Sequence, residues 1–342
     1  MAKRTTRASF EKPTTKPRTP AGDAWRAFRQ NKIAMGGMVF IILVTLMALF
    51  APLLTPYDFA TQNTSNSRSK PMTAYIVTTD KLDRCHWAGT PLEWGCTLYL
   101  TGSDALGRDL WSRVVYGTRV SLAVALVGSS VSFIIGIVYG TLSGFIGGRL
   151  DNLLMRIVDF LYATPFTVMV ILMQVYFKAL TRQGATGVMG LLIGWNRAMG
   201  GMLFLFIALG ALSWLGMARL ARGQVLSQKN KEYVEAARAL GVGNARIIFR
   251  HLIPNILGPL LISLSMGIPG WIFTETVLSF IGLGVDPPTP SWGAMISEGA
   301  QGIRSASYMV LVPGAALTLL TLAFNFVGDG LRDAFDPSSH GR

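Results

Sequence analysis

The sequence predicts an all-α membrane protein with six transmembrane helices and with both termini in the cytoplasm. Three observations lead to this fold class: a low content of charge, six long apolar runs, and an uneven placement of Lys and Arg. Of the 342 residues, 51% are hydrophobic and only 14% are charged, whereas a soluble domain carries about 25% charged residues. The composition therefore excludes an ordinary soluble domain.

Six apolar runs are long enough, or nearly long enough, to cross a bilayer, which takes about 20 residues. None contains Lys, Arg, Asp or Glu, and they are Ile33–Leu54, Val120–Leu142, Phe160–Phe177, Ala198–Ala218, Ile253–Thr274 and Ser305–Gly328. The third run is the shortest and carries Pro165 near its start. The fifth run contains Pro254, Pro259 and Pro269, so we expect a kink in it.

The distribution of positive charge gives the predicted orientation. With the N-terminus inside, the cytoplasmic segments hold 20 Lys and Arg residues and the outside segments hold 11. Positive residues favour the cytoplasmic side of a membrane protein. The net charge of +13 is thus explained by topology, and we expect no nucleic-acid partner.

The apolar runs divide the chain into segments with distinct predicted places. The first run is longer than the apolar part of a signal peptide, about 7–15 residues, so we expect it to remain as an uncleaved span. The segments are 1–32, a basic cytoplasmic tail that ends in an interfacial helix at Trp25–Lys32; 33–54, the first span; 55–119, an outside loop; 120–328, a core of five spans that includes the inner loop 219–252; and 329–342, a cytoplasmic tail.

Three smaller features add local predictions. The short apolar stretch Gly187–Gly194 is interpreted as an interfacial or re-entrant piece of an outside loop. Asp109 and Arg113 would stand one turn apart on a helix and could pair. Gly328–Gly330 is expected to end the sixth span, because glycine tolerates the conformation that follows a helix.

Both cysteines, Cys85 and Cys96, fall in the first outside loop. An extracytoplasmic compartment is oxidising, so a disulfide is predicted. Two alternatives remain: a metal site formed with His86, for which a fourth ligand is missing, and two free thiols. We expect no bound metal in this chain.

Several kinds of catalytic site are absent from the sequence. There is no G-x-x-x-x-G-K-[ST] phosphate loop, so the chain is not expected to hydrolyse ATP. None of the three histidines lies inside a predicted span, which argues against an intramembrane Ser–His protease. The sequence therefore offers no candidate catalytic site, and we expect that the chain is not an enzyme.

The inner loop between the fourth and fifth spans is polar and helical in pattern. Its first helix is predicted at Asn230–Leu240, where Tyr233, Ala236, Ala237 and Leu240 would form one apolar stripe. Gly241 follows this helix, at a position where the end of a helix favours a residue that tolerates positive φ, so a sharp turn is expected there; Pro254 marks the junction with the fifth span. The loop has two interpretations: a helix that inserts into a groove of a partner, or a loop folded against its own membrane domain.

The spacing within this loop resembles the "EAA" signature of ABC importer permeases. The matching positions are Glu235-Ala236-Ala237, Gly241 and Pro254, while His251 and Ile253 replace the Ile and Leu of the family pattern. The stretches "GSDALGRDLWSRVVYGTRVSL", "LSFIGLGVDPPTPSWGAM" and "AFNFVGDGLRDAFDP" resemble the dipeptide/oligopeptide/nickel permease family. The chain is therefore identified as similar to the second permease subunit of such importers.

The resemblance implies a type I ABC importer permease in the bacterial cytoplasmic (inner) membrane. It implies a heterodimer with a second related permease, two ATPase subunits that bind ATP and Mg, and an extracytoplasmic solute-binding protein; no cofactor is expected in this chain itself. Peptides are the expected solute, with nickel or another small solute as the alternative, and an ion-driven secondary transporter as a more distant one.

The resemblance also assigns the inner loop to ATPase docking. The residues carried over to that role are Tyr233, Glu235, Ala236, Ala237, Arg238 and Gly241. For the translocation pathway or an outer gate, the sequence offers Glu275, which lies just beyond the fifth apolar run. An acid near membrane depth usually faces a cavity or a partner, although Glu275 could equally be a solvated helix end.

Overall fold

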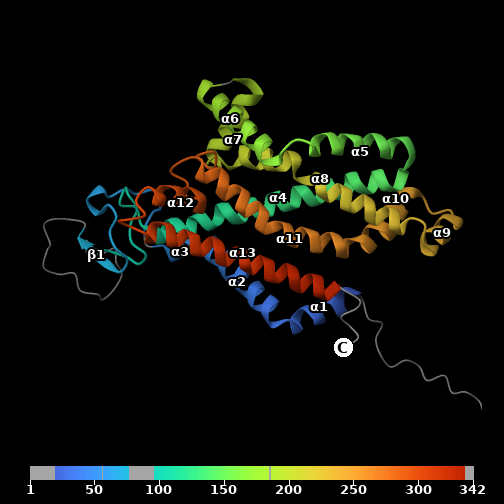
Figure 1. The fold of residues 1–342 in the computed structure, drawn as a ribbon, viewed down its shortest axis with the longest axis horizontal. Coiled ribbons are helices and arrows are strands. Elements are labelled where there is room, and N and C mark those ends of the chain that lie inside the picture. Colours follow the sequence, from blue (N-terminus) through green and yellow to red (C-terminus); the bar gives the residue numbers. More distant parts are fainter. Residues whose placement is uncertain (1–19, 56, 77–95, 185, 336–342) are drawn as a thin grey trace, which may run out of the picture.

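Long helices run side by side along the molecule, as the computed structural model shows (Figure 1). The structure describes residues 20–55, 57–76, 96–184 and 186–335. Within these ranges the protein is helical apart from one small antiparallel sheet of β1 (Thr73–Ile76) and β2 (Cys96–Tyr99). The prediction of an all-α protein is thus correct for the membrane part and wrong for this loop, where short β-branched and aromatic segments pair.

The N-terminal helices lie against the last helix of the chain. Helix α1 (Pro20–Gln30) ends at Asn31, whose side chain caps α2 (Lys32–Leu49) by accepting from the backbone N–H of Ile33 and Ala34. Helix α3 (Ala51–Leu54) completes the predicted first span. A helix precedes the first span, as predicted, but it covers Pro20–Gln30, and Lys32 already belongs to α2. Its buried Ala24 and Phe28 pack on α13 (Tyr308–Phe335), and its place at the membrane interface stays a prediction.

The centre of the fold is the pair α4 (Leu110–Ile146) and α8 (Met202–Gln228). Helix α4 has 37 residues, which corresponds to about 55 Å at 1.5 Å per residue. It begins at Asp109, whose carboxylate accepts from the backbone N–H of Ser112. Because Asp109 caps the helix, it does not form the predicted ion pair with Arg113; that arginine binds Asp104 and Glu298 instead.

The predicted third span is broken. Helices α5 (Gly148–Tyr162) and α6 (Phe166–Gln183) meet at a bend of 76°, so a single straight helix over Phe160–Phe177 is wrong. Pro165 explains the break, because it lacks a backbone N–H and disfavours helical geometry at the preceding residue. The apolar stretch after α6 forms a helix, α7 (Gly187–Ala198), and Figure 1 shows α6 and α7 projecting together from the long bundle.

The second half of the chain returns along the same bundle. After α8 come α9 (Glu232–Ala239), α10 (Asn244–Ile247), a π-helical turn (Ile248–Leu252), α11 (Ile253–Phe280), α12 (Trp292–Ala300) and α13. Helix α13 continues through Gly328 and Gly330, so the predicted stop is wrong. A Cβ at Gly330 would lie 2.2 Å from the Cβ of Ala34, which indicates that this glycine serves close packing on α2.

Five helical segments in the described ranges are long and apolar enough to cross a membrane. They are α2, α4, α8, the continuous segment Asn244–Phe280, and α13. The bent pair α5 and α6 makes a sixth if it counts as one span.

Candidate functional site

Helix α9 lies at one end of the bundle, in the loop that the sequence assigns to docking (Figure 1). One side of this helix is buried: Val234 and Ala237 belong to a cluster with residues of α4, α8 and α11. The opposite side exposes Glu235, Ala236 and Leu240, and the Leu240 side chain is 84% exposed. The predicted apolar stripe is thus divided between two faces of the helix, because Ala237 faces the membrane domain while Ala236 and Leu240 face away from it.

The other predicted docking residues hold the helix in place. The hydroxyl of Tyr233 donates to Oε1 of Gln228 at 3.2 Å, and burial raises the pKa of this phenol above its usual value, so it stays neutral at physiological pH. The guanidinium of Arg238 lies 5.6 Å from the centre of the Phe145 ring at the end of α4. Both side chains attach α9 to its own membrane domain.

The end of α9 is a tight turn made possible by Gly241. Its φ is +74°, and its N–H donates to the carbonyl of Arg238 while the N–H of Val242 donates to that of Ala237. This pair of bonds is a Schellman motif, which requires a left-handed residue at the position of Gly241. The prediction of a turn that needs glycine is confirmed.

The chain after the turn runs without interruption into the membrane. Helix α10, the π-helical turn and α11 follow one another directly and form one candidate span, Asn244–Phe280. Pro254 stands in the first turn of α11, where its missing N–H costs little. A displacement of α9 would therefore reach α11 through one short turn.

Ion pairs fix the helices above α9 to one another. Arg222 of α8 binds Asp151 of α5 with two bonds, Nε to Oδ1 at 2.6 Å and Nη2 to Oδ2 at 2.7 Å. Lys229, at the end of α8, donates to the carbonyl of Gly144 in α4 at 2.9 Å. A bidentate arginine–carboxylate pair has a specific geometry, so it ties α8 to α5 at this end of the bundle.

Glu275 is fully buried within α11. Its Oε1 accepts from the hydroxyl of Ser279 at 2.6 Å. Next to it, Gly293 of α12 comes so close that a Cβ there would lie 2.3 Å from the carbonyl of Thr276. The carboxyl group is thus enclosed where α12 packs on α11 in this single chain, and its assignment to a gate or pathway stays a prediction.

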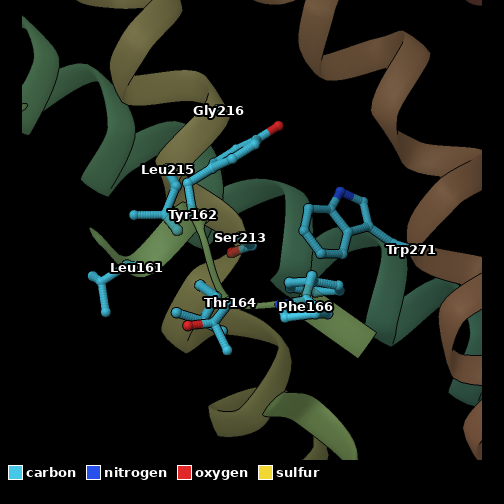
Figure 2. A pocket seen from close by; sticks show the side chains of 10 residues that line it. Leu161, Tyr162, Thr164, Phe166, Ser213, Leu215, Gly216 and Trp271 are labelled. Carbon is cyan, nitrogen blue, oxygen red and sulfur yellow. The ribbon is translucent and has the colours of Figure 1, made fainter. Parts of the chain in front are cut away.

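A hollow of about 380 Å³ opens beside the break between α5 and α6. Figure 2 shows Trp271 reaching from α11 toward Phe166, with Tyr162 on the α5 side. The rings of Phe166 and Trp271 meet edge to face with centroids 6.2 Å apart. Sequence reasoning did not find this hollow, although Pro165 in a short apolar run signalled the break that forms it.

The cysteine prediction stays open. Cys96 begins β2, and Cys85 and His86 lie outside the described residues, so their pairing is still a prediction.

These features define the class of protein: a helical membrane protein with several candidate spans, carrying a surface helix that is mounted at one end of the bundle. The chain belongs to the family described as binding-protein-dependent transport system inner membrane component, which matches residues 120–340. Residues 19–71 match a second family, described as the N-terminal TM domain of oligopeptide transport permease C.

Named relatives agree with this assignment. The oligopeptide transport system permease protein OppC of Bacillus subtilis is 37% identical over 92% of this chain and 88% of its own length. The di/tripeptide transport system permease protein DppC of Pseudomonas aeruginosa is 34% identical over 93% of this chain and 92% of its own. Among solved structures, a chain of the inward-facing MetNI methionine ABC transporter has a TM-score of 0.47 and 17% identity, over 65% of this chain and 96% of that one.

Proposed function

We propose that the chain is one of two permease subunits of an ATP-binding-cassette importer that moves peptides across the inner membrane. The names of its relatives support the solute class, because they are oligopeptide, dipeptide and di/tripeptide permeases. The family's dependence on a binding protein favours this importer over an ion-driven secondary carrier. Nickel or another small solute is the alternative that the test below separates from peptides.

The proposed topology has six spans in a type I importer permease architecture, with α5 and α6 counted as one span. Both termini then lie on the same side, and the excess of Lys and Arg supports the cytoplasm as that side. Helix α9 also faces the cytoplasm in this arrangement, and the β1–β2 loop faces outward. A second, related permease completes the pore as a heterodimer, and a binding protein delivers the solute from outside.

The observation that carries the proposal is the exposed face of α9. Leu240 is 84% exposed on a helix whose other face is buried in the membrane domain, and Ala236 beside it offers little bulk. An exposed apolar side chain next to small residues suits insertion into a groove of a partner. Glu235, Ala236, Leu240 and Gly241 would contact an ATPase subunit, while Tyr233, Ala237 and Arg238 hold the helix.

Two such ATPase subunits, which bind ATP and Mg, would drive transport. When they close on ATP, each carries its docked helix with it. The movement passes through the Gly241 turn into α10 and α11, and through the Lys229 contact into α4. Rigid-body movement of packed helices is a common form of such switching.

The proposal is tested by purification and uptake together. The chain is expressed with its genomic neighbours, isolated in detergent, identified with its partners by mass spectrometry, and reconstituted into proteoliposomes. We expect a second permease and ATPase subunits to come with it, and a radiolabelled tripeptide to be taken up only with ATP and the binding protein. Isolation of the chain alone would contradict the importer, and uptake of Ni²⁺ but no peptide would contradict the solute.

A further inference from the structure

A polar pocket lies at the end of α8 opposite to α9. Its volume is about 340 Å³, and its walls come from α6, α7, the start of α8 and the loop after α11. Because α8 has 27 residues, the pocket is about 40 Å from α9 at 1.5 Å per residue. In the proposed topology it opens on the outer side of the membrane, where a solute arrives.

The pocket contains a buried amide without a partner. Gln174 of α6 lines it and is 2% exposed, and its Nε2 has no hydrogen-bond partner among the described residues. An unsatisfied buried donor is unfavourable, and such groups in folded proteins call for an explanation. A ligand that accepts a hydrogen bond here would supply the missing partner.

The charges around this amide favour an anion. Lys178 is already satisfied, because its Nζ lies 3.3 Å from Oδ1 of Asp286 and donates to the carbonyl of Gly282 at 3.1 Å. Arg182, one turn further along α6, makes no ion pair with any residue that the structure describes. The rim of the pocket therefore carries one uncompensated positive charge, on the exposed Arg182, and arginine is the side chain best suited to bind a carboxylate with two parallel bonds.

The walls are built to hold their shape. Asn196 of α7 is 3% exposed, and its Oδ1 accepts from the backbone N–H of Phe204 in α8 at 3.0 Å. The N–H of Asp286 donates to the carbonyl of Gly200 at 3.0 Å, and a Cβ at Gly201 would lie 2.7 Å from that nitrogen. A preformed pocket binds without the cost of ordering its parts.

We propose that this pocket binds the carboxylate group of the incoming solute, which for a peptide is its C-terminus. The carboxylate would accept from Arg182 and from Nε2 of Gln174. The inference rests on the proposed function and extends it, because it names the chemical group of the solute that the permease itself recognises.

The test compares a tripeptide having a free C-terminus with the same tripeptide amidated, using the complete importer in phosphatidylcholine proteoliposomes. Because the binding protein is the same for every variant, its own preference cancels when the acid-to-amide uptake ratio of a variant is compared with that of the wild type. We expect Arg182→Gln and Gln174→Met each to lower the ratio of acid to amide uptake about tenfold, as for a lost hydrogen bond to a charged group. Arg197→Gln, an exposed arginine of α7 outside the pocket, should leave the ratio unchanged.

An unchanged ratio in both pocket variants would overturn the proposal. The proposal would also be overturned if the pocket substitutions lowered uptake only in vesicles that contain phosphatidylglycerol, and by the same factor for both peptides. The anion bound in the pocket would then be a lipid phosphate. If the wild-type importer takes up neither peptide, the proposed function fails. The pocket is then tested alone, by measuring the melting temperature of the purified complex with an N-acetyl amino acid or with its amide. The acid, but not the amide, should raise the melting temperature of the wild type, and neither should raise that of Arg182→Gln.

Discussion

At the scale of single residues, Arg113 shows how the outer end of the bundle is held. It is 2% exposed, and its Nη1 binds both the buried Asp104 and Oε2 of Glu298, the latter at 2.7 Å. Arg108 joins the same two carboxylates. The four side chains are electrically neutral together, and they connect the loop before α4 and the start of α4 with α12, where Glu298 lies 185 residues further along the chain than Arg113.

Removing Arg113 should destabilise the protein strongly. Arg113→Met leaves Asp104 buried with one fewer positive partner, and breaking a buried ion pair in this way costs about 3–5 kcal/mol. We expect a clearly lower melting temperature in detergent. Arg304→Met, a change of the same kind at an exposed arginine, is the control; equal melting temperatures for the two variants would contradict the role given to the cluster.

At the scale of elements, the contact between α4 and α8 depends on glycines four residues apart. A Cβ at Gly136 would lie 2.5 Å from the Cβ of Met217, one at Gly140 would lie 2.2 Å from the carbonyl oxygen of Ala218, and one at Gly144 would lie 3.0 Å from that of Arg222. Small residues at this spacing let two membrane helices approach closely, and packing there replaces the hydrophobic effect as the source of stability.

A single methyl group should disturb this contact. Gly140→Ala forces the backbones of α4 and α8 apart, and overpacking of this kind costs about 1–3 kcal/mol. Gly223→Ala, on α8 with nothing within 4 Å of the added carbon, should instead stabilise slightly, by about 0.5–1 kcal/mol from helix propensity. The melting temperatures of the two variants and the wild type, measured together, show whether Gly140→Ala lowers stability and Gly223→Ala raises it. An unchanged melting temperature for Gly140→Ala would contradict the close approach of α4 and α8.

The sequence located the elements better than it described their ends. Each of the five helical segments that could cross a membrane by itself overlaps one predicted apolar run, because a bilayer demands about 20 apolar residues whatever their neighbours. The sequence showed Pro165 in the third run, but the size of the bend there was not predicted. The continuation through Gly330 was missed because it depends on the close packing of that glycine against Ala34. The β1–β2 pair was missed because two strands of four residues give almost no periodic signal.

The candidate site could be predicted from the sequence to about the same extent as the fold. The turn at Gly241 followed from its position after a helix, and the resemblance pointed to the loop. The face of α9 that is buried could not be predicted, because a helix of eight residues offers two apolar sides, and only the packing of Val234 and Ala237 on α8 and α11 decides between them. The polar pocket at Gln174 was missed for a related reason, since its walls come from four separate segments.

At the scale of the whole molecule, the proposed function makes the protein a lever. Movement of the ATPase subunits would enter at α9, pass through the Gly241 turn, and move α11 relative to α8 and α5, which the Arg222–Asp151 pair holds together. Rigidity at the turn is essential to this idea, because a loose connection would absorb the movement. Gly241 at φ +74° and Gly243 at φ −64° offer matched positions to test it, since neither would bring a Cβ within 4 Å of another atom.

The most direct measurement is peptide uptake by the reconstituted importer carrying Gly241→Val or Gly243→Val. A left-handed conformation costs an L-residue about 1–2 kcal/mol and a β-branched one more, so Gly241→Val should distort the turn, reduce ATPase co-purification and lower uptake per ATP hydrolysed. Gly243→Val, in a conformation that valine adopts freely, should retain both. Equal uptake per ATP in the two variants and the wild type would contradict the claim that α9 couples the ATPases to the pore.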